Sequence, residues 1–281
     1  NLKKNFYIEF ISIIILGALT SLSLPPYNFT FINFITLSLF FIFIFFKKKN
    51  YDNNKKFLYG WLFGLGYFST NLYWITISLT FDENTKYLIP FALILIPVSL
   101  AIFYGLATYF FFTINVKKPT SNLFLFSLLI GVVEFLRGNI FTGFPWNLIA
   151  YSFSNQLEVL GIISIIGTYG FNLFCISLFA SPAIFLLNQT KKNISVSIVF
   201  ITLPFLFYFY GSSYKQTFLA SDKIIYDYKV RAIGSNISLD RFYSNIEPVS
   251  VIKDLIDISD PNKDDKTIFV WPEGILPDIY Q

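Results

Sequence analysis

The chain has 281 residues, of which 54% are hydrophobic and 14% are charged, and its formal net charge is +4. Soluble domains carry about one quarter charged residues, so the composition excludes an ordinary soluble protein. The sequence has no histidine and one cysteine, Cys175. This rules out an internal disulfide and histidine acid–base catalysis by the residues present, and it argues against the usual zinc and haem ligand sets.

Seven apolar stretches are each long enough to cross the roughly 30 Å hydrocarbon core of a bilayer as a helix. They are approximately Ile8–Leu24, Phe29–Phe46, Phe57–Leu79, Tyr87–Ile114, Leu123–Arg137, Leu157–Leu187 and Ile194–Tyr210. The sequence therefore predicts a polytopic α-helical membrane domain with seven spans over residues 1–211.

Glycines inside two of these stretches carry further information. Gly60, Gly64 and Gly66 lie in the third stretch, where small residues favour close helix packing. The sixth stretch is unusually long and contains Gly161, Gly167 and Gly170. It predicts a tilt, a kink or a re-entrant start.

Lysines gather in every second connection between the stretches. They are Lys3, Lys4, Lys47, Lys48, Lys49, Lys55, Lys56, Lys117, Lys118, Lys191 and Lys192. The alternate connections contain one lysine, Lys86. Because cytoplasmic loops carry an excess of Lys and Arg, we expect the N-terminus in the cytoplasm and the residues after Tyr210 outside. The positive charge is thus a topology signal, and we expect no nucleic-acid partner.

The composition changes at Gly211, and residues 212–281 are expected to form a second domain. This tail contains eight basic and eleven acidic residues. Its pattern predicts a strand over Lys229–Ile233, a helix over Asn245–Ser259 and a buried strand over Thr267–Val270. A strand–helix–strand succession is the first unit of an α/β domain.

One carboxylate follows the second predicted strand directly. Glu273 lies in the sequence Trp271-Pro272-Glu273-Gly274, with a further proline at Pro277. A carboxylate that lies between prolines at a strand end is placed rather than free, so Glu273 is a candidate catalytic residue. The alternative is an exposed acid of the kind found at strand ends in any α/β domain.

Two charged residues lie near the end of the fifth stretch. Glu134 and Arg137 are three residues apart and can pair on one helix face. Intramembrane charges are often functional, so the pair is a candidate for positioning a lipid headgroup. A structural ion pair near the membrane boundary, with Arg137 snorkelling, is the alternative.

Two tryptophans are candidates for contact with lipid, and the cysteine is a possible nucleophile. Trp146, in Phe144-Pro145-Trp146, is either an interfacial aromatic anchor or a substrate contact. Trp74, at the end of the third stretch, is a further candidate for lipid binding. Cys175 lies within the sixth stretch, and a free cysteine in apolar surroundings is normally inert packing.

Several of these motifs together resemble the apolipoprotein N-acyltransferases, bacterial inner-membrane enzymes with a nitrilase-like domain. The specific matches are Glu134-Phe135-Leu136-Arg137-Gly138, Thr142-Gly143-Phe144-Pro145-Trp146-Asn147, Tyr151-Ser152 and Val270-Trp271-Pro272-Glu273. Weaker ones are Ser23-Leu24-Pro25-Pro26-Tyr27, Gly60-Trp61-Leu62-Phe63-Gly64 and Tyr73-Trp74. The chain departs from the family pattern after the first tail strand. Gly234 stands near a usual Gln, and Phe242-Tyr243 near a usual Lys-Trp pair.

The resemblance implies an activity and a location. An acyl chain would pass from a phosphatidylethanolamine-type phospholipid to an enzyme cysteine, and then to the α-amino group of a diacylglyceryl-cysteine apolipoprotein. No cofactor is implied. The protein would lie in the bacterial inner membrane with a periplasmic CN-hydrolase domain that begins at residue 212. When complete, that domain is a four-layer α-β-β-α sandwich.

The resemblance also assigns the catalytic groups. Glu273 would be the general base, and the family's lysine and cysteine are expected downstream of Gln281. We therefore expect the chain as given to lack its true start and its catalytic half, and to be inactive. Two other functions stay open: a transporter or channel with an accessory outer tail, and a non-catalytic lipid-binding or scaffold protein.

Overall fold

The computed structural model describes residues 2–49, 55–140, 143–221, 227–234 and 248–275. It divides into two compact units. The first contains Asn1–Thr76 and Ile89–Ala220, and the second contains Ile77–Leu88 and Ser221–Gln281. Each unit is described separately below.

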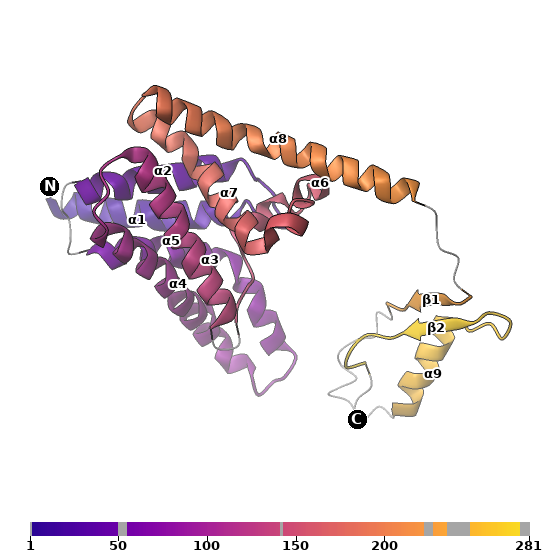
Figure 1. Cartoon of the computed structure of the whole chain (residues 1–281). Helices are drawn as coiled ribbons and strands as arrows, with labels where there is room; N and C mark the ends of the chain where they lie inside the picture. The colour runs from indigo at the N-terminus through magenta and orange to yellow at the C-terminus, as the bar shows by residue number, and fades with distance from the viewer. Residues whose placement is uncertain (1, 50–54, 141–142, 222–226, 235–247, 276–281) are drawn as a thin grey trace. The chain divides into compact units, whose positions relative to one another are not determined.

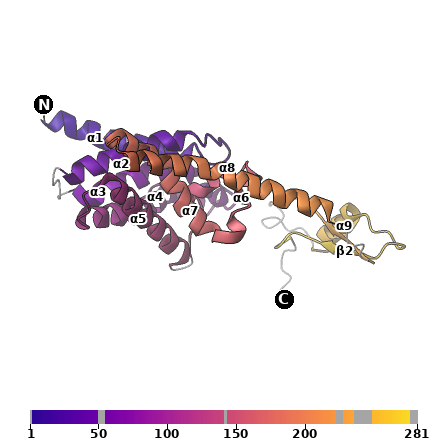
Figure 2. The same cartoon turned by 45° about the horizontal axis from the view of Figure 1, so that its top comes forward.

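The first unit is a bundle of α-helices (Figure 1). Its helices are α1 (Leu2–Ser21), α2 (Ile32–Lys49), α3 (Lys56–Asn71), α4 (Ile89–Thr113), α5 (Pro119–Asn139), α6 (Leu157–Leu160), α7 (Ile163–Leu187) and α8 (Lys191–Ala220). The 3-10 helix η4 (Ile149–Phe153) also belongs to this unit, whereas η2 (Tyr73–Thr80) spans the boundary at Thr76 and η3 (Lys86–Leu88) belongs to the second unit. Helix α3 packs on α1 and α4, and α7 packs on α2, α5 and α8. Figure 2 shows α8 alongside α7 from a second direction.

Four helices among the described residues are long and apolar enough to cross a membrane. They are Lys86–Thr113, Pro119–Asn139, Ile163–Leu187 and Lys191–Ala220. These match the last four of the seven predicted spans. The first three correspond to helices as well, but α1 has a shorter apolar part, Tyr7–Ser21, α2 ends in lysines and α3 has 16 residues. For all seven stretches, crossing of the membrane stays a prediction.

The third predicted span was wrong at its C-terminal end. Helix α3 ends at Asn71, and η2 follows with no buried residue. Within η2, the hydroxyls of Thr76 and Thr80 donate to the carbonyl oxygens of Tyr73 and Ile77, three residues earlier, at 2.7 Å each. Such side-chain bonds to nearby backbone compete with α-helix. Apolarity alone could not reveal this change.

The sixth predicted span is interrupted, as its glycines indicated. Helix α6 ends at Leu160, and α7 begins at Ile163. Within α7, Gly167 has φ 70° and ψ 166°, which is not helical. Glycine adopts a positive φ without the steric cost that a side chain brings, so the predicted kink is confirmed and lies at Gly167.

Close packing at glycines is confirmed for the third stretch. A Cβ on Gly66 would overlap the carbonyl oxygen of Ile14 in α1, and a Cβ on Gly17 would overlap that of Phe63 in α3. A Cβ on Gly60 would overlap the carbonyl oxygen of Tyr104 in α4. The backbones of α1, α3 and α4 therefore approach more closely than any larger residue would permit.

The connections between helices sort onto two ends of the bundle. The lysine-rich connections meet around one cavity, which Lys48, Lys56, Lys117 and Asn188 help to line. At the other end, Thr30 Oγ1 donates to the carbonyl oxygen of Ser152 at 2.6 Å. Successive helices of the bundle thus run in alternating directions, as a chain that crosses a membrane repeatedly requires.

The second unit contains a small parallel sheet. Strand β1 (Lys229–Ala232) pairs with β2 (Thr267–Val270), with Lys229 opposite Thr267 and Ala232 opposite Val270. Helix α9 (Pro248–Ser259) lies between them in sequence. Buried Val251 and Leu255 of α9 form a small core with Ile275, against which Trp271 packs. Residues 245–247 of the predicted helix lie outside the described part.

Candidate functional site

A buried ion pair lies near the C-terminal end of α5. Arg137 Nη2 lies 2.5 Å from Glu134 Oε2, and the two residues are 2% and 0% exposed. Their spacing of three on α5 predicted the pairing, which is confirmed. The hydroxyl of Tyr104, in α4, donates to the other carboxylate oxygen, Oε1, at 2.5 Å. Both oxygens of Glu134 therefore have a donor, as a buried carboxylate requires.

The other guanidinium nitrogen of Arg137 binds a loop. Arg137 Nη1 donates to the carbonyl oxygens of Phe144 and Trp146, at 2.7 Å each. The guanidinium also lies over the ring of Phe68, 5.2 Å from its centroid. Because Arg137 points into the protein, the interpretation of a snorkelling side chain was wrong. The planar guanidinium joins one carboxylate and two backbone carbonyls, a geometry that suits arginine.

The segment Phe144–Asn147, called the Trp146 loop below, is held mainly through its backbone. Its residue Asn147 has φ 60°, in the left-handed region that Asn tolerates better than most residues. The hydroxyl of Tyr67, in α3, donates to the carbonyl oxygen of Asn147 at 2.8 Å. The backbone N–H of Phe144 donates to the carbonyl oxygen of Arg137 at 2.8 Å. Helices α3 and α5 together therefore fix the shape of the loop.

The loop presents an aromatic pair. The indole of Trp146 stacks on that of Trp74, with ring centroids 4.9 Å apart and 13° between the planes. Trp146 is 50% exposed and Trp74 is 36% exposed. The candidate residues therefore form one connected cluster, although they come from separate motifs of the sequence. They are Trp74, Glu134, Arg137 and Trp146. An interfacial anchor and a substrate contact are both compatible with this exposed pair.

Another aromatic residue borders the loop. The hydroxyl of Tyr151, in η4, donates to the carbonyl oxygen of Pro145 at 3.4 Å. Burial raises the pKa of this hydroxyl above its ordinary value, and the neighbouring Tyr169 adds to the effect. Tyr151 therefore stays protonated at neutral pH and keeps its hydrogen-bond donor.

Sequence reasoning missed three residues of the cluster: Tyr67, Phe68 and Tyr104. The two tyrosines are buried inside otherwise apolar helices, where a hydroxyl needs a partner. A polar aromatic residue within an apolar stretch is a usable signal. In this chain the signal is weak, because the sequence contains 36 Phe and 18 Tyr and a single aromatic residue does not stand out among them.

Glu273 lies just past β2 and is exposed. Its neighbours are fixed on α9. Trp271 Nε1 donates to Ser259 Oγ at 3.0 Å, and Ile275 is buried against Val251 and Leu255. Gly274, with φ 65°, provides the turn between Glu273 and Ile275. The carboxylate is thus placed on a short turn with an anchored residue near each end.

Cys175 is fully buried in α7. It forms part of the apolar core of the bundle, next to Phe171, Phe174 and Phe179 in the same helix. This burial agrees with a packing role, since a reactive cysteine is at least partly accessible.

The fold and the site define a class: a helical membrane protein in which a buried ion pair holds an exposed aromatic loop. A family sequence model described as the apolipoprotein N-acyltransferase N-terminal domain matches residues 16–181 of the chain. The chain therefore belongs to the apolipoprotein N-acyltransferase family.

Individual relatives carry the same name. The apolipoprotein N-acyltransferase of Rhodopseudomonas palustris is 28% identical over 276 residues, which cover 93% of this chain and 50% of the relative. That of Allorhizobium ampelinum is 26% identical over 94% of this chain and 51% of its own length. The enzyme of Rickettsia bellii is 34% identical over 59% of this chain and 32% of its own length. The chain spans about half the length of the first two relatives.

Proposed function

We propose that this chain supplies the membrane domain and the general base of an apolipoprotein N-acyltransferase. The complete protein would transfer an acyl chain from a phospholipid to the α-amino group of a diacylglyceryl-cysteine apolipoprotein. The observation that carries the proposal is the match of residues 16–181 to the family's N-terminal domain. No cofactor is required, because the acyl donor is already an ester.

The proposed reaction proceeds in two halves through a thioester. Glu273 takes the proton of a cysteine thiol supplied by the rest of the domain, and the thiolate attacks the ester carbonyl of the phospholipid. A lysine stabilises the tetrahedral oxyanion. The lysophospholipid alcohol leaves with the proton from Glu273. The lipoprotein amine then attacks the thioester, Glu273 takes the amine proton and returns it to the sulfur, and an amide and a free thiol result.

The proposed topology follows from the sorting of connections onto two ends of the bundle. Seven crossings, α1–α5, α7 and α8, would place the lysine-rich end in the cytoplasm by the positive-inside rule. The Trp146 loop and the nitrilase-like domain that begins at residue 212 would then share the periplasmic side of the bacterial inner membrane. Both substrates are lipid-anchored, so a catalytic domain joined to a membrane bundle can reach their reacting groups at the bilayer surface.

The roles proposed for the cluster follow from its exposure. Trp74 and Trp146 form the contact surface for the lipid substrates, and Glu134 and Arg137 act as positioning residues that hold this surface. The buried pair offers almost no surface to a headgroup, since Glu134 and Arg137 are 0% and 2% exposed. This favours positioning of the loop over direct contact with a lipid.

The test uses the complete protein and a phospholipid with a radiolabelled acyl chain. Glu273→Gln should abolish transfer of label to the protein, because an amide cannot take the thiol proton. Asp257→Asn, which removes an exposed carboxylate of α9, is the matched control and should leave labelling unchanged. Normal labelling of Glu273→Gln would sink the assignment of the base. Absence of labelling in the unaltered protein would favour a non-catalytic lipid-binding protein.

A further inference from the structure

The cavity at the lysine-rich end of the bundle has no part in the proposed reaction. It has a volume of about 890 Å³, within the range of ligand sites in proteins. Its lining comes from the C-terminal end of α2, the N-terminal ends of α3 and α5, the α4–α5 connection and the end of α7. Residues 45–48, 56, 112–122 and 187–188 therefore contribute to one site.

Three lysines line this cavity: Lys48, Lys56 and Lys117. The lining residues include no carboxylate, and in the described part of the chain none of the three lysines forms an ion pair. Neighbouring Lys47, in contrast, pairs with Glu9 at 2.7 Å. With three cationic groups and no carboxylate among its described lining residues, the cavity is electrostatically suited to an anion.

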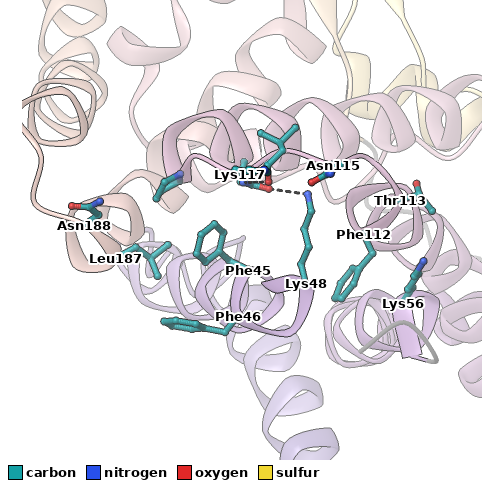
Figure 3. A pocket seen from close by; sticks show the side chains of 13 residues that line it. Phe45, Phe46, Lys48, Lys56, Phe112, Thr113, Asn115, Lys117, Leu187 and Asn188 are labelled. Carbon is teal, nitrogen blue, oxygen red and sulfur yellow. Dashed lines mark hydrogen bonds between the residues drawn. The ribbon is translucent and has the colours of Figure 1, made fainter. Parts of the chain in front are cut away.

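Lys48 is held in position by neutral groups. Its Nζ donates to Asn122 Oδ1 at 2.9 Å and lies 4.3 Å from the centroid of the Phe111 ring. Asn122 is itself 1% exposed and donates to the carbonyl oxygens of Val116 and Lys118. Figure 3 shows Lys48 extending between Phe45 and Phe112 toward the connection that carries Asn115 and Lys117. The cation is thus pre-positioned at the cavity.

The surroundings of Lys48 leave its charge uncompensated. Burial lowers the pKa of Lys48 to about 8. A bound anion would stabilise the charged amine and offset this cost of burial. The N-terminus of α5, at Pro119, adds the positive end of a helix dipole to the same cavity.

One wall of the cavity is apolar, while Thr113, Asn115, Asn122 and Asn188 add neutral polar groups elsewhere in the lining. Phe45, Phe46 and Leu187 lie on the side opposite Thr113 and Lys56 in Figure 3. A free inorganic anion gains nothing from such a wall, whereas the glycerol and first acyl carbons of a phospholipid do. The cavity also lies where α2, α4 and α7 end, which the proposed topology places at the depth of the cytoplasmic lipid headgroups.

We propose that this cavity binds the phosphate-bearing headgroup of an anionic phospholipid, as a structural lipid distinct from the acyl donor. Basic pockets between membrane helices are known to suit such headgroups. The site lies at the end of the bundle opposite the Trp146 loop. The inference rests on the membrane embedding of the bundle and is independent of acyl transfer.

The test is native mass spectrometry of the complete protein titrated with phosphatidylglycerol, and separately with phosphatidylcholine of the same acyl chains. Lys48→Gln and Lys117→Gln should each weaken phosphatidylglycerol binding about fivefold, since one lysine near an anionic headgroup is worth about 1 kcal/mol. Lys192→Gln is the matched control. It removes the same charge at the same end of the bundle, but Lys192 does not line the cavity.

The outcomes separate the alternatives. Unchanged binding in both Lys48→Gln and Lys117→Gln, or equal weakening in Lys192→Gln, would overturn the site. Lys117 is exposed, so Lys117→Gln should fold and decides the question if Lys48→Gln does not. Inorganic phosphate that displaces the lipid at equal molar concentration would show a plain phosphate site and overturn the lipid assignment. Equal affinity for phosphatidylcholine would overturn the requirement for net negative charge.

Discussion

Arg137 holds the Trp146 loop by its backbone: the guanidinium Nη1 lies 2.7 Å from the carbonyl oxygen of Trp146. The same guanidinium pairs with Glu134 through Nη2. One side chain therefore couples an anion buried in α5 to the position of an exposed indole. This coupling yields the first prediction.

A variant in which Glu134 and Arg137 are exchanged should have neither the stability nor the acyl-transfer activity of the unaltered protein. In Glu134→Arg/Arg137→Glu the pair could re-form, but a carboxylate at position 137 cannot donate to the carbonyl oxygens of Phe144 and Trp146. Arg137→Gln alone should lower the free energy of unfolding by about 3–5 kcal/mol, because it leaves Glu134 buried without its partner. Denaturant unfolding in detergent and acyl transfer by the complete protein are the measurements.

Lys118→Gln provides the control for that series. It removes an exposed charge near the start of α5 and should change stability by less than about 0.5 kcal/mol. Full activity of the exchanged pair would mean that ion pairing alone is sufficient and that the carbonyl contacts of Arg137 are dispensable.

The stacked indoles should be coupled energetically. A double-mutant cycle of Trp74→Ala and Trp146→Ala should give a coupling energy of about 0.5–1.5 kcal/mol, the usual range for aromatic pairs. Trp146→Ala should also slow acyl transfer while the backbone contacts of the loop persist. Normal turnover with unchanged lipid affinity would instead support an interfacial anchor.

Helix packing should depend on Gly17 and Gly66. Gly66→Ala places a methyl group on the carbonyl oxygen of Ile14, and Gly17→Ala places one on that of Phe63. Each should destabilise the bundle by about 1–3 kcal/mol. Gly170→Ala is the control, because its Cβ would make an ordinary contact, 3.4 Å from the Cβ of Ile166. Similar thermal stability of all three variants would contradict the close α1–α3 approach.

The turn that carries Glu273 should depend on Ser259. Ser259→Ala removes the acceptor of the Trp271 indole N–H, which should cost about 1 kcal/mol of stability. Formation of the thioester in the complete protein should slow more than binding of phospholipid weakens, because the base is displaced and the lipid contacts are not. Ser259→Thr keeps a hydroxyl and should recover most of the rate. An Ala variant as fast as Thr would show that the hydrogen bond is not needed.

Much of the membrane half could be predicted from patterns in the sequence. The last four long apolar helices, an irregularity in the glycine-containing sixth stretch and the pairing of Glu134 with Arg137 follow from apolar length, glycine content and a spacing of three. These are local properties of one helix. Strand Thr267–Val270 was likewise marked by its own apolar run, but its predicted burial was wrong, because Ile268 and Val270 are about half exposed in the two-stranded sheet.

Contacts between distant segments could not be predicted. Nothing local to Trp74 indicates that it stacks on Trp146, and nothing local to Arg137 indicates that it binds the carbonyl oxygens of a loop seven and nine residues later. The end of α3 at Asn71 was missed because apolar residues continue to Leu79 and the change to a 3-10 helix depends on threonine hydroxyls. The lysine-lined cavity is formed by residues 45–48, 56, 112–122 and 187–188. In the sequence, the lysines of these segments indicate only which ends of the helices face the cytoplasm.

Because the Trp146 loop is held through its main chain, the path of its backbone does not depend on which side chains it carries. Arg137 and Tyr67 bind carbonyl oxygens that every amino acid possesses. Side chains at Phe144 and Trp146 can therefore drift while the path of the loop persists. Single substitutions at these two positions can therefore change the exposed surface of the loop while the backbone hydrogen bonds that hold it are kept.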